Sequence, residues 1–303
     1  MSKPRRLRRA VSGILLLDKP LGLSSNAALQ RVKHLYQADK AGHTGSLDPL
    51  ATGVLPICLG EATKLSGHLL EADKQYCADL RLGVQTSTGD AEGEVINTCA
   101  PPGDAALQVA ATRLCGEIEQ VPPMYSALKH RGQPLYALAR QGVEVERKAR
   151  QVRIDSLRVV RLTEDTARLW VRCSKGTYIR TLAEDLARLA GSCASLSALR
   201  RTAVMPFEDR PLVTLEWLDQ LAREGGQAAV DAQLLAPVEG VRNWPQVRVD
   251  VALAAQLAQG RQVSVPLPVD RGRIAVLDEA GQLLGLAEAV GSSELAPRRW
   301  LRG

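Results

Sequence analysis

Aromatic residues are scarce in this chain of 303 residues, since phenylalanine, tryptophan and tyrosine together make up only 3% of it. The six cysteines form no Cys-x-x-Cys pair, and none of the four histidines stands at metal-ligand spacing from a cysteine. This pattern argues against a structural zinc site and against a disulfide scaffold. Most of the cysteines lie among apolar residues, so we expect small buried side chains. Phosphate-cradling and dinucleotide-binding glycine motifs are also missing, and we therefore expect neither a metal nor a cofactor.

Long apolar runs are missing as well, and no stretch reaches the length of a membrane span. The run Ile14-Leu15-Leu16-Leu17 follows a basic N-terminus, as in a signal peptide, but it is too short and ends at Asp18-Lys19-Pro20. We therefore expect a cytoplasmic protein without a membrane anchor. We also expect a monomer, because nothing in the chain suggests an interface.

The positive charge is modest in total but clustered along the chain. The formal net charge is +6, and basic residues crowd residues 1–10 and the block from Lys129 to Arg153. Clustered cations fit a polyanionic partner such as nucleic acid. A solubilising surface is the alternative for the block. Residues 1–10 could likewise be a basic arm that touches RNA or a disordered tail.

Strand and helix patterns mix without strict alternation, which predicts an α+β fold with an antiparallel or mixed sheet. Period-two alternation and apolar runs predict strands at 13–17, 54–59, 76–82, 152–162 and 167–173. Helical patterns cover 24–36, 61–70, 104–114, 177–189 and 215–223. Residues 86–93 are polar and typical of a turn. After a Gly- and Pro-rich stretch at 225–245, short strand-like pieces at 261–265, 273–277, 283–289 and 298–301 predict a small β-rich C-terminal module.

The most unusual segment runs from Ala41 to Leu59 and reads AGHTGSLDPLATGVLPICL. Glycines flank His43 and Thr44, and Asp48 precedes a proline, which restricts the backbone of the preceding residue. Such a loop can hold one carboxylate in a fixed direction. The alternative interpretation of the Asp-Pro pair is an ordinary surface turn.

This segment does not stand alone, and the combination resembles the TruB family of pseudouridine synthases. The family's catalytic loop, G-H-[ST]-G-[AST]-L-D-P-x-A-x-G-x-L, matches Gly42 to Leu55. The further matching segments follow in the family's order over residues 13–205. They are Asp18-Lys19-Pro20, Lys74-Gln75-Tyr76, Gln120 to Ala127 with Tyr136 to Gly142, Ser174 to Leu182, and Leu199-Arg200-Arg201.

The resemblance implies a domain organisation and a substrate. It predicts a basic N-terminal arm at 1–10, a catalytic domain at 11–245 with an RNA-binding insertion at about 124–152, and a PUA-like RNA-binding domain at 246–303. It also implies that the sheet of the catalytic domain is mixed, mainly antiparallel, and flanked by helices. The family isomerises uridine 55 in the T loop of tRNA to pseudouridine, with base flipping and without a cofactor or an obligatory protein partner. We therefore expect tRNA as the substrate.

The resemblance also implies roles for individual residues. Asp48 would be the catalytic carboxylate, Arg180 its guanidinium partner, and Tyr76 both a platform for the flipped uracil and an acceptor of the C5 proton. The pocket would also be lined by Tyr178 and Leu199, while His43 would stack in the RNA where the uridine had been. Contacts to the RNA backbone would come from the basic block, at Lys129, Arg131, Arg147, Lys148 and Arg150.

The chain departs from the family at Cys193-Ala194-Ser195, where relatives usually carry Gly-Ala-His, and the departure affects a local RNA contact rather than the chemistry. Three other functions are compatible with parts of the sequence. The scaffold could serve a non-catalytic RNA-binding or tRNA-folding protein, which would not need the set Asp48, Tyr76 and Arg180. It could act on a different RNA. A glycoside hydrolase would require a pair of carboxylates, and the sequence singles out one.

Overall fold

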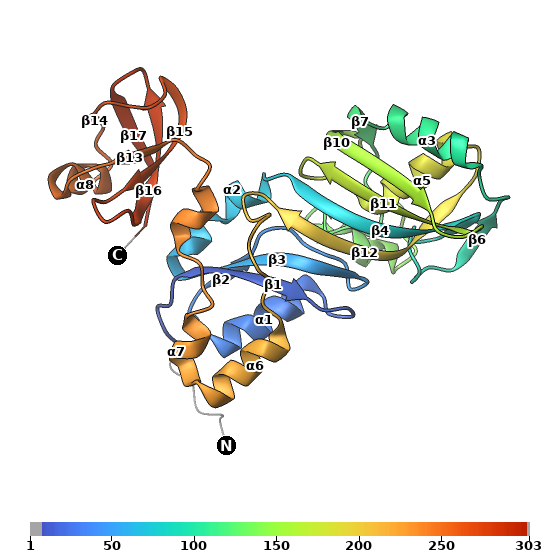
Figure 1. Cartoon of the computed structure of the whole chain (residues 1–303), viewed down its shortest axis with the longest axis horizontal. Coiled ribbons are helices and arrows are strands. Elements are labelled where there is room, and N and C mark those ends of the chain that lie inside the picture. Colours follow the sequence, from blue (N-terminus) through green and yellow to red (C-terminus); the bar gives the residue numbers. More distant parts are fainter. Residues whose placement is uncertain (1–7, 302–303) are drawn as a thin grey trace.

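The structure is a computed structural model that describes residues 8–301 (Figure 1). Within this range a long mixed sheet carries helices, and a smaller β-rich unit lies at the C-terminal end (Figure 1). The predicted α+β class is confirmed. The expected basic arm at residues 1–10 lies mostly outside the described residues. The part that is described is held in place, because the guanidinium of Arg9 pairs with Asp231.

The large sheet positions most of the residues that the motifs singled out. Among residues 8–301 it has eight strands, which pair antiparallel except for β12 and β3. Its spatial order is β1 (Gly13–Lys19), β3 (Ala51–Leu59), β12 (Ala194–Val204), β4 (Lys74–Leu82), β11 (Thr166–Cys173), β10 (Arg150–Arg161) and β7 (Gly116–Gln120), with β2 (Ala41–His43) paired to β3. Strands β1 and β3 are buried on both faces, which explains the unbroken apolar run Ile14–Leu17.

Two groups of helices cover the sheet. The helices α3 (Asp104–Arg113) and α5 (Ile179–Leu189) pack on the half formed by β4, β10, β11 and β12. The helices α1 (Ser25–Leu35) and α6 (Leu215–Glu224) pack on β1 and β3, with α7 (Gly226–Asp231) after α6. As predicted, α1 follows a serine cap, because the Ser24 hydroxyl accepts a hydrogen bond from the Ala27 N–H. None of the helices within residues 8–301 is long and apolar enough to cross a membrane.

The helix expected at 61–70 is wrong in detail. The chain forms a 3₁₀ helix, η1 (Gly60–Leu65), followed by the short α2 (Ser66–Leu70). The Thr63 hydroxyl donates to the Gly60 carbonyl over 2.7 Å. Such a local side-chain bond competes with a regular helical ladder, which gives a physical reason for the tighter first turn.

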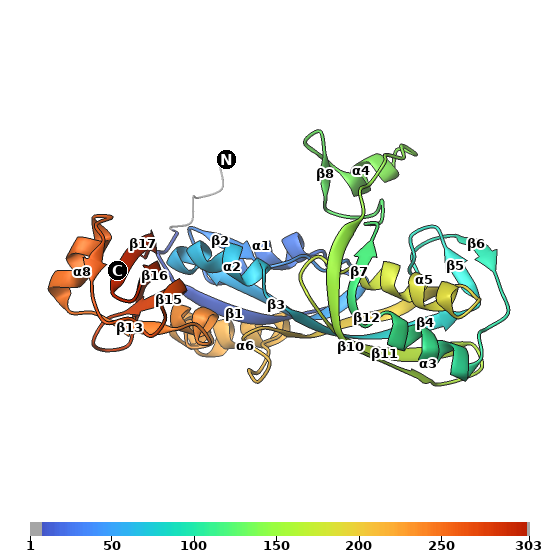
Figure 2. The same ribbon diagram turned by 90° about the horizontal axis from the view of Figure 1, so that it is seen from above.

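Two excursions leave the large sheet. Between β7 and β10 the chain forms a projecting arm, here defined as residues 121–149, that contains β8 (Lys129–His130), β9 (Gln133–Pro134) and α4 (Leu135–Ala139) (Figure 2). The hairpin of β5 (Val84–Thr86) and β6 (Val95–Thr98) follows β4. The turn predicted at 86–93 lies within this hairpin, although its first residue ends β5.

The predicted β-rich C-terminal module is confirmed. Its sheet has the order β13 (Gln246–Arg248), β15 (Arg271–Leu277), β16 (Leu283–Val290), β17 (Glu294–Trp300) and β14 (Val263–Ser264). The sequence did not predict α8 (Val251–Ala258), which begins where the Asp250 carboxylate accepts a hydrogen bond from the Leu253 N–H. The 3₁₀ helix η2 (Pro237–Val241) precedes the module. Side chains such as Leu277 and Leu301 share one buried cluster with Ile14 and Leu65, so the module packs on the part of the chain that contains the large sheet.

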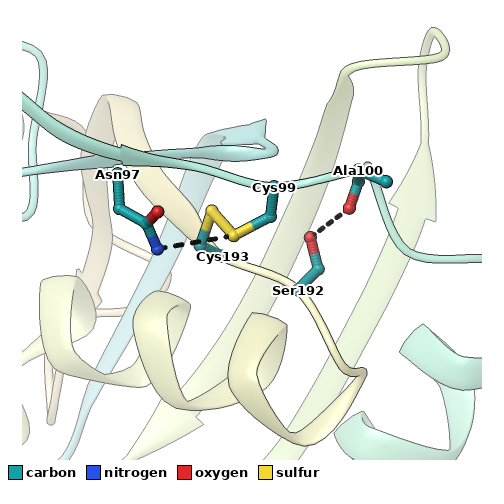
Figure 3. Close-up of a disulfide and its surroundings, with 5 residues drawn as sticks. All are labelled: Asn97, Cys99, Ala100, Ser192 and Cys193. Atoms are coloured by element: carbon teal, nitrogen blue, oxygen red, sulfur yellow. Dashed lines mark hydrogen bonds between the residues drawn. A yellow bond between two sulfur atoms is a disulfide. The ribbon is translucent and has the colours of Figure 1, made fainter.

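Two cysteines correct the expectation drawn from composition. Cys99, just after β6, and Cys193, between α5 and β12, form a disulfide, with their Cα atoms 5.9 Å apart (Figure 3). A hydrogen bond of 2.6 Å from the Ser192 hydroxyl to the Ala100 carbonyl joins the same two segments (Figure 3). The pairing brings together cysteines far apart in sequence, which spacing motifs do not detect. Of the remaining four, Cys58 and Cys173 are buried, Cys77 is half-buried and Cys115 is exposed.

Candidate active site

The loop between β2 and β3 holds Asp48 through several backbone contacts. The Ser25 hydroxyl, at the start of α1, accepts from the Leu47 N–H over 2.7 Å and donates to the Leu47 carbonyl over 3.0 Å. Gly45 has a φ of +103°, a region that favours glycine. The Asp48 carbonyl accepts from the Ala51 N–H at the start of β3. The loop is therefore tied at both ends, which fixes the backbone from which the Asp48 side chain projects.

A buried guanidinium meets this carboxylate. Arg180, in the first turn of α5, has only 6% of its side chain exposed, and its Nη2 lies 2.9 Å from Asp48 Oδ2. The same guanidinium donates to the Thr88 and Tyr125 carbonyls over 3.0 and 2.6 Å. These carbonyls come from the hairpin and from the arm. Arg180 thus joins three parts of the chain at Asp48, and the geometry gives it the position predicted for the carboxylate's partner.

The sequence missed a second carboxylate, Asp90. It is 3% exposed, and its Oδ2 lies 3.6 Å from Arg180 Nη1. Its Oδ1 accepts from the Thr88 hydroxyl and from the Glu92 N–H over 2.5 and 3.1 Å. In sequence Asp90 is one polar residue in a turn-like stretch. Only the folding of the hairpin onto α5 shows that it faces an arginine, so no local signal could have found it.

One cavity of about 380 Å³ lies on one side of Asp48. Three predicted pocket residues line it: Tyr76 from β4, Tyr178 at the start of α5, and Leu199 from β12. The Tyr178 backbone is fixed on both sides by Gln120, a residue 2% exposed whose amide accepts from the Tyr178 N–H and donates to its carbonyl. The structure therefore brings these predicted residues together around one chamber.

His43 lines a second cavity rather than the first. A second cavity of about 510 Å³ is lined by His43 and by Tyr136 of the arm, and it shares Asp48 and Arg180 with the first. Burial and the charge of Arg201 lower the pKa of His43, which favours the neutral imidazole. Asp48 thus lies where a cavity lined by Tyr76 and Tyr178 adjoins a cavity lined by His43.

The protonation of Asp48 reflects competing neighbours. Burial by the walls of the two cavities raises the pKa of the Asp48 carboxyl, Arg180 opposes this effect, and Asp90 adds to it. The pKa of the Tyr76 hydroxyl is likewise raised by burial and lowered by Arg201. The site therefore holds a carboxylate whose charged form is favoured by Arg180 and Lys19, and a phenol that burial makes a weaker acid and Arg201 a stronger one.

The predicted cations of the RNA backbone site lie in or next to the arm. Lys129, Arg131, Lys148 and Arg150 are exposed. Arg147 differs, because it donates to the Pro122 carbonyl and pairs with Glu144 at 3.0 Å. Four of the five cations are therefore accessible to a polyanion, while Arg147 is engaged in holding the arm together.

Comparisons with known proteins agree with this arrangement. Family models match three consecutive parts of the chain: a TruB family pseudouridylate synthase N-terminal domain at residues 33–179, a tRNA pseudouridylate synthase B C-terminal domain at 180–241, and a pseudouridine synthase II TruB C-terminal region at 245–301. A chain in the crystal structure of a Cbf5-Nop10-Gar1 complex superposes with a TM-score of 0.73 at 28% identity, covering 95% of this chain and 83% of that one. Fold and site together define a pseudouridylate synthase, an isomerase.

The curated relatives narrow the class. The chain is 49% identical to the tRNA pseudouridine synthase B of Pseudomonas aeruginosa over 303 residues, which cover all of both chains. It is 51% identical over 301 residues to the protein of the same name from Ectopseudomonas mendocina, covering 99% of this chain and 98% of that one. The chain belongs to the TruB family of pseudouridylate synthases.

Proposed function

We propose that this enzyme isomerises uridine 55 in the T loop of tRNA to pseudouridine, with Asp48 as the catalytic carboxylate. The observation that carries the proposal is the pair formed by Asp48 and the buried Arg180 where two cavities meet. The substrate follows from the relatives, which are named as tRNA pseudouridine synthases. Uridine 55 follows from the matched family motifs.

The reaction breaks the bond from ribose C1′ to uracil N1 and forms a bond from C1′ to C5. The C5 proton leaves and N1 gains a proton, so no electrons or groups are consumed. Asp48 begins the reaction as a nucleophile toward the sugar or base, or as a base toward the sugar. Arg180 keeps the carboxylate charged and oriented. Tyr76 relays the C5 proton, because its phenol can take that proton only as its own hydroxyl proton is released.

The target uridine has to leave its stack to reach Asp48. Two adjoining cavities that meet at Asp48 support this step. The flipped uracil occupies the chamber of Tyr76, Tyr178 and Leu199, where an aromatic ring can stack on it. His43, in the other chamber, fills the space left in the RNA, and its lowered pKa suits stacking as a neutral ring.

The arm provides most of the contacts to the RNA backbone. Its exposed cations, together with Arg150 at the start of β10, contact phosphates and supply affinity with little sequence information. The shape of the folded T loop and its unstacked bases supply specificity. We further propose that the enzyme works as a cytoplasmic monomer without a protein partner. A non-catalytic tRNA-folding role could use the same arm, but it leaves the pair of Asp48 and Arg180 without a purpose.

The test is tritium release from an unmodified tRNA transcript that carries 5-tritiated uridine, in metal-free buffer. Wild type, Asp48→Asn and a control, Asp18→Asn, are compared. Asp18 is a carboxylate of β1 that pairs with Arg200 on the sheet. We expect release by wild type and the control, none by Asp48→Asn, and tRNA affinities within a few-fold, since Asn keeps the shape and removes the charge.

The position of the product separates the remaining alternatives. Sequencing of the converted transcript should place the pseudouridine at position 55 alone. Full turnover by Asp48→Asn would refute the catalytic assignment. Release at another position would refute the substrate while leaving the assignment intact. If wild type binds tRNA and releases no tritium from it, the tRNA-folding role replaces the catalytic one.

A further inference from the structure

Arg201 is a buried arginine without an acidic partner. It lies on β12 and is 1% exposed. Among residues 8–301, no carboxylate is within ion-pair distance of its guanidinium. Instead, its Nε donates to the Val54 carbonyl over 2.7 Å, and its Nη2 donates to the Gly45 carbonyl over 3.2 Å. Burial of an unpaired charge is costly, so a residue of this kind points to a purpose beyond packing.

The two carbonyls that Arg201 holds belong to the segment that carries Asp48. Gly45 precedes Asp48 in the loop, and Val54 follows it in β3. Arg201 therefore spans the loop from the side of the sheet. The side chain also lines the cavity that contains Tyr76, which is its cross-strand neighbour on β4.

The backbone around Arg201 is arranged to admit this geometry. Gly53 of β3 has a φ of +99°, and a Cβ placed there would come within 2.1 Å of the Arg201 carbonyl oxygen. The pairing of β12 with β4 shifts register between Arg201 and Ala203. The close approach of Gly53 lets β12 pair with the start of β3, just after the loop, and from there the guanidinium reaches the Gly45 carbonyl.

The preceding residue provides a contrast. Arg200 points to the other face of the sheet, where 44% of its side chain is exposed and its Nη2 lies 2.8 Å from Asp18. It forms an ordinary two-pronged surface ion pair. Two adjacent arginines on one strand thus have opposite environments. Of the two, only Arg201 lines the cavity that contains Tyr76.

The charge of Arg201 reaches several groups of the site. It lowers the pKa of Tyr76, of His43, and of the buried lysines Lys19 and Lys74. The charge of Arg201 therefore affects the pKa of groups that line both cavities. The carbonyl contacts of Arg201 fix geometry, and its charge opposes the effect of burial on the Tyr76 phenol, which makes release of the phenol proton easier.

We infer that Arg201 is a positioning residue for the isomerisation: it fixes the loop of Asp48 against the strand pair that carries Tyr76 and Leu199. This inference rests on the proposed function, because it gives Arg201 a task only if Asp48 and Tyr76 act on the substrate. Arg180 holds Asp48 from the side of α5, and Arg201 holds its loop from the side of the sheet. The carboxylate is thereby oriented from two directions.

The test compares Arg201→Gln, Arg201→Lys and the matched control Arg200→Gln in the full chain. The measurements are the single-turnover rate on unmodified tRNA, the tRNA dissociation constant and the melting temperature. For Arg201→Gln we expect a loss of rate of about 100-fold, typical of a misplaced catalytic group, at an affinity within a few-fold of wild type. Arg201→Lys keeps the charge but not the planar fork, and we expect a loss of about tenfold. Arg200→Gln should retain the wild-type rate.

A titration adds a readout that general destabilisation does not move. The C2 protons of the four histidines can be followed by NMR against pH. The pKa of His43 should rise in Arg201→Gln, because a nearby cation has been removed, and it should stay unchanged in Arg200→Gln.

The outcomes separate this inference from the proposed function. If Asp48→Asn turns over normally, the proposed function fails whatever Arg201 does. If Asp48→Asn is inactive and folded Arg201→Gln matches Arg200→Gln in rate, the inference about Arg201 fails alone. A rate loss that only tracks weaker tRNA binding also overturns it. If Arg201→Gln does not fold, Arg201→Lys decides, and a wild-type rate in that variant overturns the inference.

Discussion

The carboxylate of Asp48 and the guanidinium of Arg180 lie 2.9 Å apart, although one residue comes from a loop between two strands and the other from the first turn of α5. The two side chains differ in exposure, at 44% for Asp48 and 6% for Arg180. The anion therefore faces the cavities while its counter-ion is fixed in the protein. In this arrangement the carboxylate is accessible to a substrate, while the arginine is shielded from solvent.

The pH dependence of the reaction should reveal the effect of Asp90 on the pKa of Asp48. Because the charge of Asp90 raises the pKa of Asp48, Asp90→Asn should lower that pKa and move the acidic limb of the rate profile to lower pH. The plateau rate should fall by about tenfold or more, since Arg180 loses one of its partners. Single-turnover rates across the acidic range measure both effects.

Glu94→Gln, an exposed residue of the same hairpin, serves as the control for this experiment. It should change neither the position of the limb nor the plateau. A limb that moves to higher pH in Asp90→Asn would contradict the placement of Asp90 beside the pair.

The arm should account for much of the salt dependence of tRNA binding. Replacing the exposed cations Lys129, Arg131 and Lys148 of the arm with glutamine should weaken binding and lower the slope of log K against log salt by about one for each phosphate that is no longer neutralised. Binding titrations at several salt concentrations give the slope. The same change at the exposed helix residues Arg113, Arg188 and Arg223 should leave the slope largely intact, and equal slopes for both triple variants would refute the role of the arm.

Two buried lysines should make the enzyme more stable as the pH rises above 8. Burial lowers the pKa of Lys19 and Lys74 from 10.5 to about 8. Between these values the unfolded chain binds more protons than the native one, so the unfolding free energy rises with pH. Each lysine should contribute about 1 kcal/mol between pH 8 and 9.

Urea unfolding at pH 8 and pH 9 measures this effect. Lys19→Met should reduce the change between pH 8 and pH 9 by about 1 kcal/mol, while Lys175→Met, at an exposed lysine paired with Glu71, should leave it unchanged. An unfolding free energy that falls over this interval in wild type would show that the lysines are better solvated than their burial indicates.

The disulfide of Cys99 and Cys193 should be detectable by counting thiols. Protein purified without reductant and alkylated in denaturant should carry four modified cysteines, and six after reduction. Because the bond closes a loop with a sequence separation of 94, reduction should lower the unfolding free energy by up to about 4 kcal/mol. Cys99→Ser should remove the effect of reductant and Cys115→Ser should not. Six modified cysteines without reductant would refute the bond.

Local patterns predicted the elements that depend on local physics. The Ser24 cap and the apolar stripe of α5 indicated helices where they occur, and alternation indicated β4, β10 and β11. The strand β12 was not predicted, although it carries Leu199 and Arg201. Its hydrogen bonds go to β3 and β4, far away in sequence, and its irregular pairing hides the alternation that a regular strand would show.

The sequence by itself determined the family and the residue at the centre of the site, because the motifs of the catalytic loop and its companions stand in a specific order. The tertiary structure decided which other residues face Asp48. Arg200 and Arg201 look equivalent in sequence, yet the pairing of β12 turns one to solvent and buries the other. Asp90 and the pair of Cys99 and Cys193 are likewise defined only when distant segments meet. A strand's side-chain direction and a contact between remote segments depend on the assembled sheet, and no local pattern encodes them.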